Sequence, residues 1–220
     1  MAECMARIGA NPTVAREEAA QWFVLGGGAE AKTCEARALE ALGARGTAAV
    51  ILAGIAADRG NGLPKATRAA MMQDAGRLWL GEKQYRLSLE ALNRAVALGL
   101  RDADLLAMRA EAKGRLGMWP EAVADLSAAL ERAPGRADLL TLRAAANRKS
   151  GDPLAGLADA EAALRKLPHY PEALFEKGAS LVVLDRVPEA LKVWFKLIEL
   201  HPDSEMAELA RRNMQRLSGN

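Results

Sequence analysis

Two cysteines and two histidines are the residues of this chain best suited to nucleophilic or metal chemistry. Cys4 and Cys34 lie in the first sixth of the sequence, far from His169 and His201. Metal sites and catalytic triads bring several such groups together. The two histidines form no His-Glu-x-x-His pair, and each flanks a proline expected in a loop. We therefore expect no metal, no cofactor and no catalytic residue.

The run Gly26-Gly27-Gly28 is the candidate for a phosphate-binding loop. Such a loop requires a lysine followed by serine or threonine just after the glycines. Here Ala29-Glu30-Ala31 follows, and the carboxylate of Glu30 would repel phosphate. The run is therefore predicted to be a turn between two helices.

The two cysteines allow two interpretations. They can be small buried residues of a cytosolic protein, or they can form a disulfide that fastens the first helix to a later one. The second case would imply an oxidising compartment. Both interpretations stay open on these residues alone.

Composition limits the class of partner. The 220 residues carry a formal net charge of +2, without the concentrated basic stripe of a nucleic-acid binder. The longest apolar run, residues 48–57, is shorter than the roughly 20 residues that span a bilayer, so no membrane insertion is expected. Abundant alanine and leucine favour helices.

These residues must be positioned by a chain that repeats every 34 residues. Four blocks, residues 69–102, 103–136, 137–170 and 171–204, place equivalent residues in register. The 27th place holds Ala95, Ala129, Ala163 and Leu197, and the 32nd holds Leu100, Pro134, Pro168 and Pro202. A period of this length indicates stacked supersecondary units.

Each repeat is predicted to contain two antiparallel helices. In residues 103–136, Gly117 ends the first helix, Pro120 begins the second and Pro134 prevents its continuation. Small residues occupy the eighth place (Gly76, Ala110, Ala144, Gly178) and the twentieth (Ser88, Ala122, Gly156, Ala190). They would let the paired helices approach closely, while larger residues at the fourth and twenty-fourth places fill the space between neighbours.

This pattern resembles the tetratricopeptide repeat family. The resemblance implies an all-α, right-handed α-solenoid of stacked antiparallel helix pairs that forms one domain over residues 1–220. We expect repeats at 12–45, 69–102, 103–136, 137–170 and 171–204, an irregular helical insert at 46–68, and a C-terminal capping helix at 205–217. The insert is interpreted as an extra or degenerate helix pair, with a flexible hinge as the alternative.

The N-terminal region is similar to that of exported bacterial proteins with these repeats. The similarity rests on Cys4, Pro12, Trp22, the triple glycine, Cys34, Ala38-Leu39 and Leu42-Gly43. It implies that Cys4 and Cys34 are paired and that the protein is periplasmic or otherwise exported. Because no secretory signal follows Met1, the sequence would be a mature form without its leader. A cytoplasmic location is the alternative.

The resemblance also implies a concave groove lined by the first helix of each repeat. Its predicted residues are Gln73, Arg77, Ala107, Glu111, Arg115, Thr141, Arg148, Lys149, Glu172, Phe175 and Val182. This mixed surface would suit an extended or helical peptide with an acidic group and an apolar anchor. We therefore expect a non-catalytic scaffold that binds a protein or peptide. An accessory subunit that activates an envelope enzyme, such as a protease or a cell-wall enzyme, is the alternative, and a homo-oligomer stays open.

Overall fold

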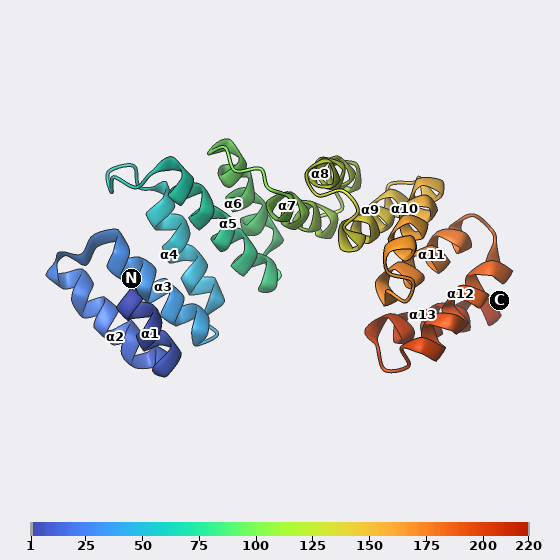
Figure 1. Cartoon of the computed structure of the whole chain (residues 1–220), viewed down its shortest axis with the longest axis horizontal. Helices are drawn as coiled ribbons and strands as arrows, with labels where there is room; N and C mark the ends of the chain where they lie inside the picture. The colour runs from blue at the N-terminus through green and yellow to red at the C-terminus, as the bar shows by residue number, and fades with distance from the viewer. Residues whose placement is uncertain (1, 220) are drawn as a thin grey trace. The chain divides into compact units, whose positions relative to one another are not determined.

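The computed structural model describes residues 2–219 as an all-helical chain (Figure 1). Met1 and Asn220, the two ends of the predicted 1–220 domain, lie outside the described residues. Over the described residues the helices are joined by short turns, and no β-strand occurs among them. The predicted fold class is therefore confirmed. The chain divides into two compact units, up to Leu116 and from Gly117 onward, and each is described by itself.

The first unit is a series of helices in which each packs on the next. Its helices are α1 (Ala2–Ala10), α2 (Pro12–Trp22), η1 (Phe23–Gly27), α3 (Gly28–Ala41), α4 (Arg45–Ala57), α5 (Lys65–Gly81), α6 (Tyr85–Ala97) and α7 (Ala103–Arg115). Besides these sequential contacts, α1 packs on α3 and α5 packs on α7. Stacked helix pairs produce such contacts, because each helix packs on the equivalent helix of the next pair.

The second unit follows the same pattern. Its helices are α8 (Trp119–Arg132), α9 (Ala137–Lys149), α10 (Pro153–Lys166), α11 (Pro171–Val183), α12 (Val187–Leu200) and α13 (Glu205–Ser218). Helix α11 also contacts α9 on one side and α13 on the other. The first helices of successive repeats therefore lie side by side within this unit.

The turns inside the helix pairs share one backbone conformation. The fifteenth place of four repeats holds Lys83, Gly117, Gly151 and Asp185, all with positive φ, at 58°, 79°, 97° and 59°. Glycine adopts this left-handed conformation without a steric penalty, and other residues do so rarely. The helix end predicted at Gly117 is confirmed, and Pro120 lies in the first turn of α8 as expected.

Close approach of the paired helices explains the small residues. A Cβ atom added to Gly76 in α5 would lie 2.6 Å from Cγ of Leu92 in α6. One added to Gly156 in α10 would lie 2.9 Å from the backbone oxygen of Ala144 in α9. Both distances are too short for real carbon contacts, so a side chain at either position would force its neighbour to move.

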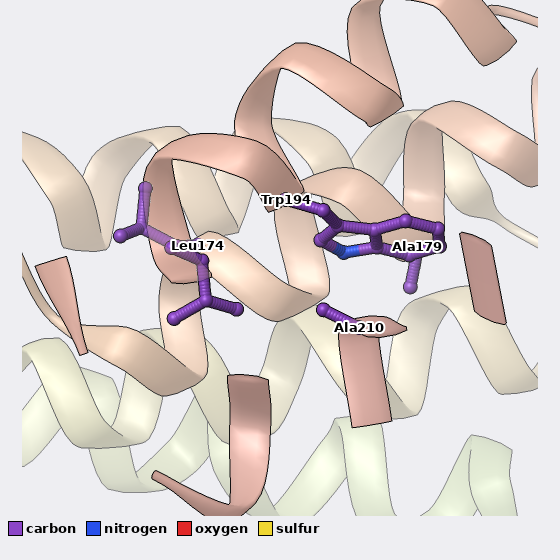
Figure 2. Packing of buried hydrophobic residues seen from close by; sticks show 5 residues of the cluster. Leu174, Ala179, Trp194 and Ala210 are labelled. Atoms are coloured by element: carbon purple, nitrogen blue, oxygen red, sulfur yellow. The ribbon is translucent and has the colours of Figure 1, made fainter. Parts of the chain in front are cut away.

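The core at the C-terminal end is built around Trp194, whose side chain is 1% exposed. The indole lies among Leu174, Ala179 and Ala210, which come from α11 and α13 (Figure 2). Met206, Met214 and Leu217 of α13 pack against the same cluster. Helix α13 therefore packs over the α11–α12 pair, and its role as a capping helix stays a prediction.

The irregular N-terminal region contains two features of interest. Gly26 inside η1 has φ of 95° and Gly28 at the start of α3 has φ of 52°, so the triple glycine forms an interhelical turn as predicted. Residues 45–57 form a regular helix, α4, which packs on both α3 and α5.

The predicted repeat boundaries stay a prediction. A block at 29–62 offers a second phasing, because it places buried Ala36 and Ala48 at places eight and twenty.

Candidate functional site

An ion pair joins the first helices of two successive repeats in the second unit. Nε and Nη2 of Arg148 on α9 donate to Oε2 of Glu176 on α11, at 2.9 and 2.8 Å. The two side chains are 14% and 13% exposed. Burial raises the pKa of the Glu176 carboxyl above its ordinary value, although the positive charges of Arg148 and Lys149 oppose that shift. The guanidinium of Arg148 is thus engaged inside the chain.

Lys149 differs from its neighbour Arg148. Its side chain is exposed, and it forms no ion pair among the described residues. It therefore supplies a positive charge at the end of α9 that a partner can reach.

Phe175 on α11 is held against the core by Trp194. The two rings are stacked with their centroids 6.1 Å apart and an interplanar angle of 22°. The indole Nε1 of Trp194 donates to the backbone oxygen of Phe175 at 3.2 Å. Because Phe175 stays partly exposed, it presents a positioned aromatic edge at the surface.

The other predicted residues of the second unit have mixed environments. Val182 is partly exposed and packs against the Trp194 cluster. Glu172 is partly exposed, but its Oε2 is buried without a hydrogen-bond partner in the described chain. Thr141 is buried, and its hydroxyl donates to the backbone oxygen of Ala137 at 2.8 Å. The hydroxyl of Thr141 is therefore bonded to its own helix backbone and offers no surface.

In the first unit, Arg77 belongs to a network of charges between α3 and α5. Arg77 Nη2 donates to Oε1 of Glu40 at 2.6 Å, and Arg37 Nη1 donates to Oε2 of Glu40 at 3.1 Å. Arg37 also pairs with Asp74. Burial by itself would raise the pKa of Glu40, but the hydrogen bonds from Arg77 and Arg37 outweigh it and hold the pKa below its ordinary value.

The remaining predicted residues of the first unit lie on α5 and α7. Gln73 Nε2 donates to Oδ1 of Asp102 at 3.4 Å. Arg115 lies 3.7 Å from Glu111, and its guanidinium carbon lies 6.0 Å from the ring centroid of Tyr85. Ala107 is partly exposed.

Exposure separates a packing face from an open face on these first helices. Ten of the eleven predicted groove residues are partly or fully exposed, Thr141 being the exception, whereas all four eighth-place residues are buried. The helix packing therefore leaves one polar side of the first helices uncovered in each unit. Binding by these residues stays a prediction.

Two residues beside the predicted ones, Glu176 and Val183, were not predicted from the sequence. Glu176 was missed because its partner Arg148 precedes it by 28 residues, a spacing that links the twelfth place of one repeat to the sixth of the next. Opposite charges at that spacing are a usable signal. Val183, at the thirteenth place, is 57% exposed beside the predicted Val182.

Cys4 and Cys34 form a disulfide between α1 and α3, with their Cα atoms 6.0 Å apart. The pairing implied by the N-terminal resemblance is therefore present. Both residues line a cavity of about 320 Å³ together with Arg7, Glu18 and Trp22.

The histidines occupy turns between repeats. Nε2 of His201 lies 2.5 Å from the backbone oxygen of His169, and the ring of His169 is exposed. Within residues 2–219, no group of three His, Cys, Asp or Glu side chains could hold a metal ion. No described helix is both long enough and apolar enough to cross a membrane.

No protein-family model matches this chain, and no curated protein matches its sequence. Solved structures do match its three-dimensional arrangement. YrrB, described as a TPR protein with an unusual peptide-binding site, is 18% identical, with a TM-score of 0.66 over 83% of this chain and 91% of that one. The described chain has a tetratricopeptide repeat (TPR) fold.

Two further TPR-type structures agree. A MamA fragment from Desulfovibrio magneticus RS-1 is 15% identical, with a TM-score of 0.70 over 80% of this chain and 97% of that one. The C-terminal part of a TPR repeat-containing protein from Cytophaga hutchinsonii is 15% identical, with a TM-score of 0.69 over 91% of this chain and 81% of that one. At these identities the likeness concerns the fold.

The TPR arrangement also accounts for an isolated asparagine. Asn147 lies at the eleventh place of its repeat and faces the paired helix α10. Its Nδ2 donates to Oδ2 of Asp159 on α10 at 3.0 Å. The same carboxylate accepts two hydrogen bonds from Arg143, at 2.8 and 2.7 Å. Asn147 is therefore part of the α9–α10 interface.

Proposed function

We propose that this chain is a non-catalytic scaffold that binds a protein or peptide segment on the open side of its first helices. The observation that carries this proposal is the exposure pattern on those helices. Their eighth places are buried between helices, while ten of eleven groove places stay accessible. A helical repeat that exposes a polar stripe with an aromatic edge suits an extended or helical peptide.

The second unit offers the clearest recognition chemistry. Lys149 supplies a free ammonium, and Phe175 supplies an apolar edge that Trp194 holds in place. An acidic group and an apolar anchor on one peptide would complement this pair. The peptide-binding site named for YrrB supports the class of function, because that protein shares the fold.

We further propose that the protein works outside the cytoplasm, in a bacterial periplasm. The Cys4–Cys34 disulfide supports this location, because disulfides persist in oxidising compartments. Intact mass of alkylated protein from its native host, with and without reductant, tests it. Complete absence of the disulfide-bonded form from the native protein would contradict export.

Site-specific photo-crosslinking tests the binding surface. A photoreactive phenylalanine analogue replaces Phe175 or Lys149, and the matched control replaces Leu154 on α10, which is 66% exposed. We expect discrete adducts from the first two positions and none from Leu154. Adducts from Leu154 alone would move the partner to the second helices and overturn the proposal.

A charge variant completes the test. Lys149→Glu should weaken capture of the crosslinked partner, while Lys166→Glu on α10 should leave capture unchanged. Arg148→Glu is unsuitable, since it would place a second carboxylate against Glu176. If the partner is an enzyme whose turnover rises when this chain is added, the accessory-subunit function replaces the passive scaffold.

A further inference from the structure

Helix α1 packs on α2 and α3 of the first unit. None of its described residues is buried. Its ion pair, Arg7 Nε to Glu18 Oε2 at 3.1 Å, joins two side chains that are each about half exposed. Exposed pairs of this kind contribute little to stability. The covalent bond from Cys4 to Cys34 is therefore the strongest connection between α1 and the rest of the unit.

The face beneath α1 contains small buried residues of α2 and α3. Ala15 and Ala19 of α2 are buried, as is Cys34 of α3. These three residues line the same cavity as Cys4 and Arg7 of α1. Helix α1 thus acts as a cover for a small apolar face that other helices of the unit build.

The disulfide is accessible on one side. The cavity of about 320 Å³ is bordered by both cysteines. Cys34 is only 3% exposed, whereas Cys4 is partly exposed. Of the two cysteines, Cys4 is therefore the one that we expect a thiolate entering the cavity to reach.

We propose that the Cys4–Cys34 disulfide is a reducible clasp, cleaved by thiol–disulfide exchange at Cys4, and that its cleavage releases α1 from the α2–α3 face. The co-reactant is a dithiol, either a small molecule or a redox-active protein. The inference goes beyond the proposed scaffold function, because it adds a modification site and a second, covered surface.

The exchange balances in two steps. A thiolate of the dithiol attacks Sγ of Cys4, the Sγ–Sγ bond breaks, and Cys34 leaves as a thiolate with the electron pair. The second thiol of the reductant then attacks the reductant sulfur that is bonded to Cys4. The mixed disulfide breaks, and Cys4 leaves as a thiolate. The reductant is oxidised to a disulfide, and its two protons are taken up by the two cysteine thiolates.

Release of α1 has a defined structural consequence. Ala15, Ala19 and the indole edge of Trp22 would become accessible on the α2–α3 face. Helix α1 packs on α2 and α3, so the structure of α5, α6 and α7 should be retained. Reduction is thus expected to expose one face without unfolding the unit.

The first test uses the full chain and reduced glutathione. The reaction is stopped with an alkylating reagent, and the products are located by peptide mass spectrometry. We expect glutathione on Cys4 and the alkyl group on Cys34 in about tenfold excess over the reverse arrangement. Glutathione mainly on Cys34, or no adduct without denaturant, would overturn attack at Cys4.

The second test measures hydrogen exchange of the same chain before and after reduction. We expect amides of α1 to exchange at least about tenfold faster after reduction, while α5–α7 keep their protection. Cys4→Ser/Cys34→Ser should reproduce the reduced pattern without reductant, and Arg7→Gln, with the disulfide intact, should retain the oxidised one. Unchanged protection of α1 in the reduced wild-type chain would overturn the clasp, and this readout does not depend on any variant folding.

Discussion

The indole of Trp194 occupies the space that a side chain on Gly178 would need. A Cβ atom added to Gly178 would lie 2.6 Å from Cδ1 of the indole. The two residues hold the eighth and twenty-fourth places of their repeat, as Gly76 and Leu92 do in the first unit. In both helix pairs, therefore, a glycine of one helix faces a large side chain of the other. The large side chain is leucine in one pair and tryptophan in the other.

Gly178→Ala should lower the free energy of unfolding by about 1–3 kcal/mol, because the indole or the backbone must move. Urea denaturation followed by circular dichroism measures it. The matched control is Gly54→Ala in α4, where an added Cβ meets nothing within 4 Å. That substitution should stabilise the protein by about 0.5–1 kcal/mol, since alanine is the better helix former. Equal effects at both sites would refute the packing argument.

Ala129→Phe should cost about 1–3 kcal/mol, because Ala129 is fully buried in α8 and a ring would overpack its surroundings. Ala124→Phe on the same helix is the control, since Ala124 is exposed. Melting curves of the two variants provide the comparison. An unchanged curve for Ala129→Phe would count against the 34-residue register.

Lys83→Gly should raise the free energy of unfolding by about 0.5–1 kcal/mol. Lys83 has φ of 58°, and the left-handed conformation disfavours residues with a Cβ more than the flexibility of glycine costs. Glu82→Gly, one residue earlier with φ of −84°, should destabilise instead. The prediction fails if chemical denaturation gives both variants the same sign.

Glu176→Gln should change how stability depends on pH. The folded state raises the pKa of Glu176 above 4.5, so the unfolded chain releases this proton at lower pH than the folded chain does. The wild-type protein should therefore lose stability relative to the variant as pH rises from 4.5 through the folded pKa, and the difference should be constant above it.

Asp138→Asn provides the opposite slope for comparison. A hydrogen bond from Arg136 holds the pKa of Asp138 below its ordinary 3.8. Its contribution should be complete above pH 3.8 and should fall as pH drops through the lower, folded pKa. Urea denaturation at a series of pH values measures the free energy of unfolding of Glu176→Gln and Asp138→Asn. The same pH dependence in both variants would contradict the pKa shifts assigned to Glu176 and Asp138.

The helix pairs of this chain could be predicted because their determinants are local. Gly117 and Pro120 mark a turn by their own backbone preferences, and small residues recur at fixed places such as Gly178. Asn147, at the eleventh place, likewise faces the paired helix because of its position along the helix. These signals need no knowledge of distant contacts.

The environment of the candidate site was harder to predict. Arg148 belongs to an ion pair with a residue on the next repeat, and Thr141 turns its hydroxyl to its own helix backbone. Both outcomes depend on how neighbouring side chains compete for partners, which periodicity does not encode. The phasing around α4 is ambiguous for a related reason, because alanines at several spacings can bury equally well.

Alanine is the commonest residue among the buried apolar positions of the described chain. A buried leucine can shrink in steps, but a buried alanine can change to glycine, which weakens the helix, or to a larger residue, for which its neighbours must adjust. Substitution of these buried alanines by smaller or by larger residues is therefore restricted. Variation is left to the outward faces, so a descendant of this chain could acquire a new binding preference while its helices keep the same spacing.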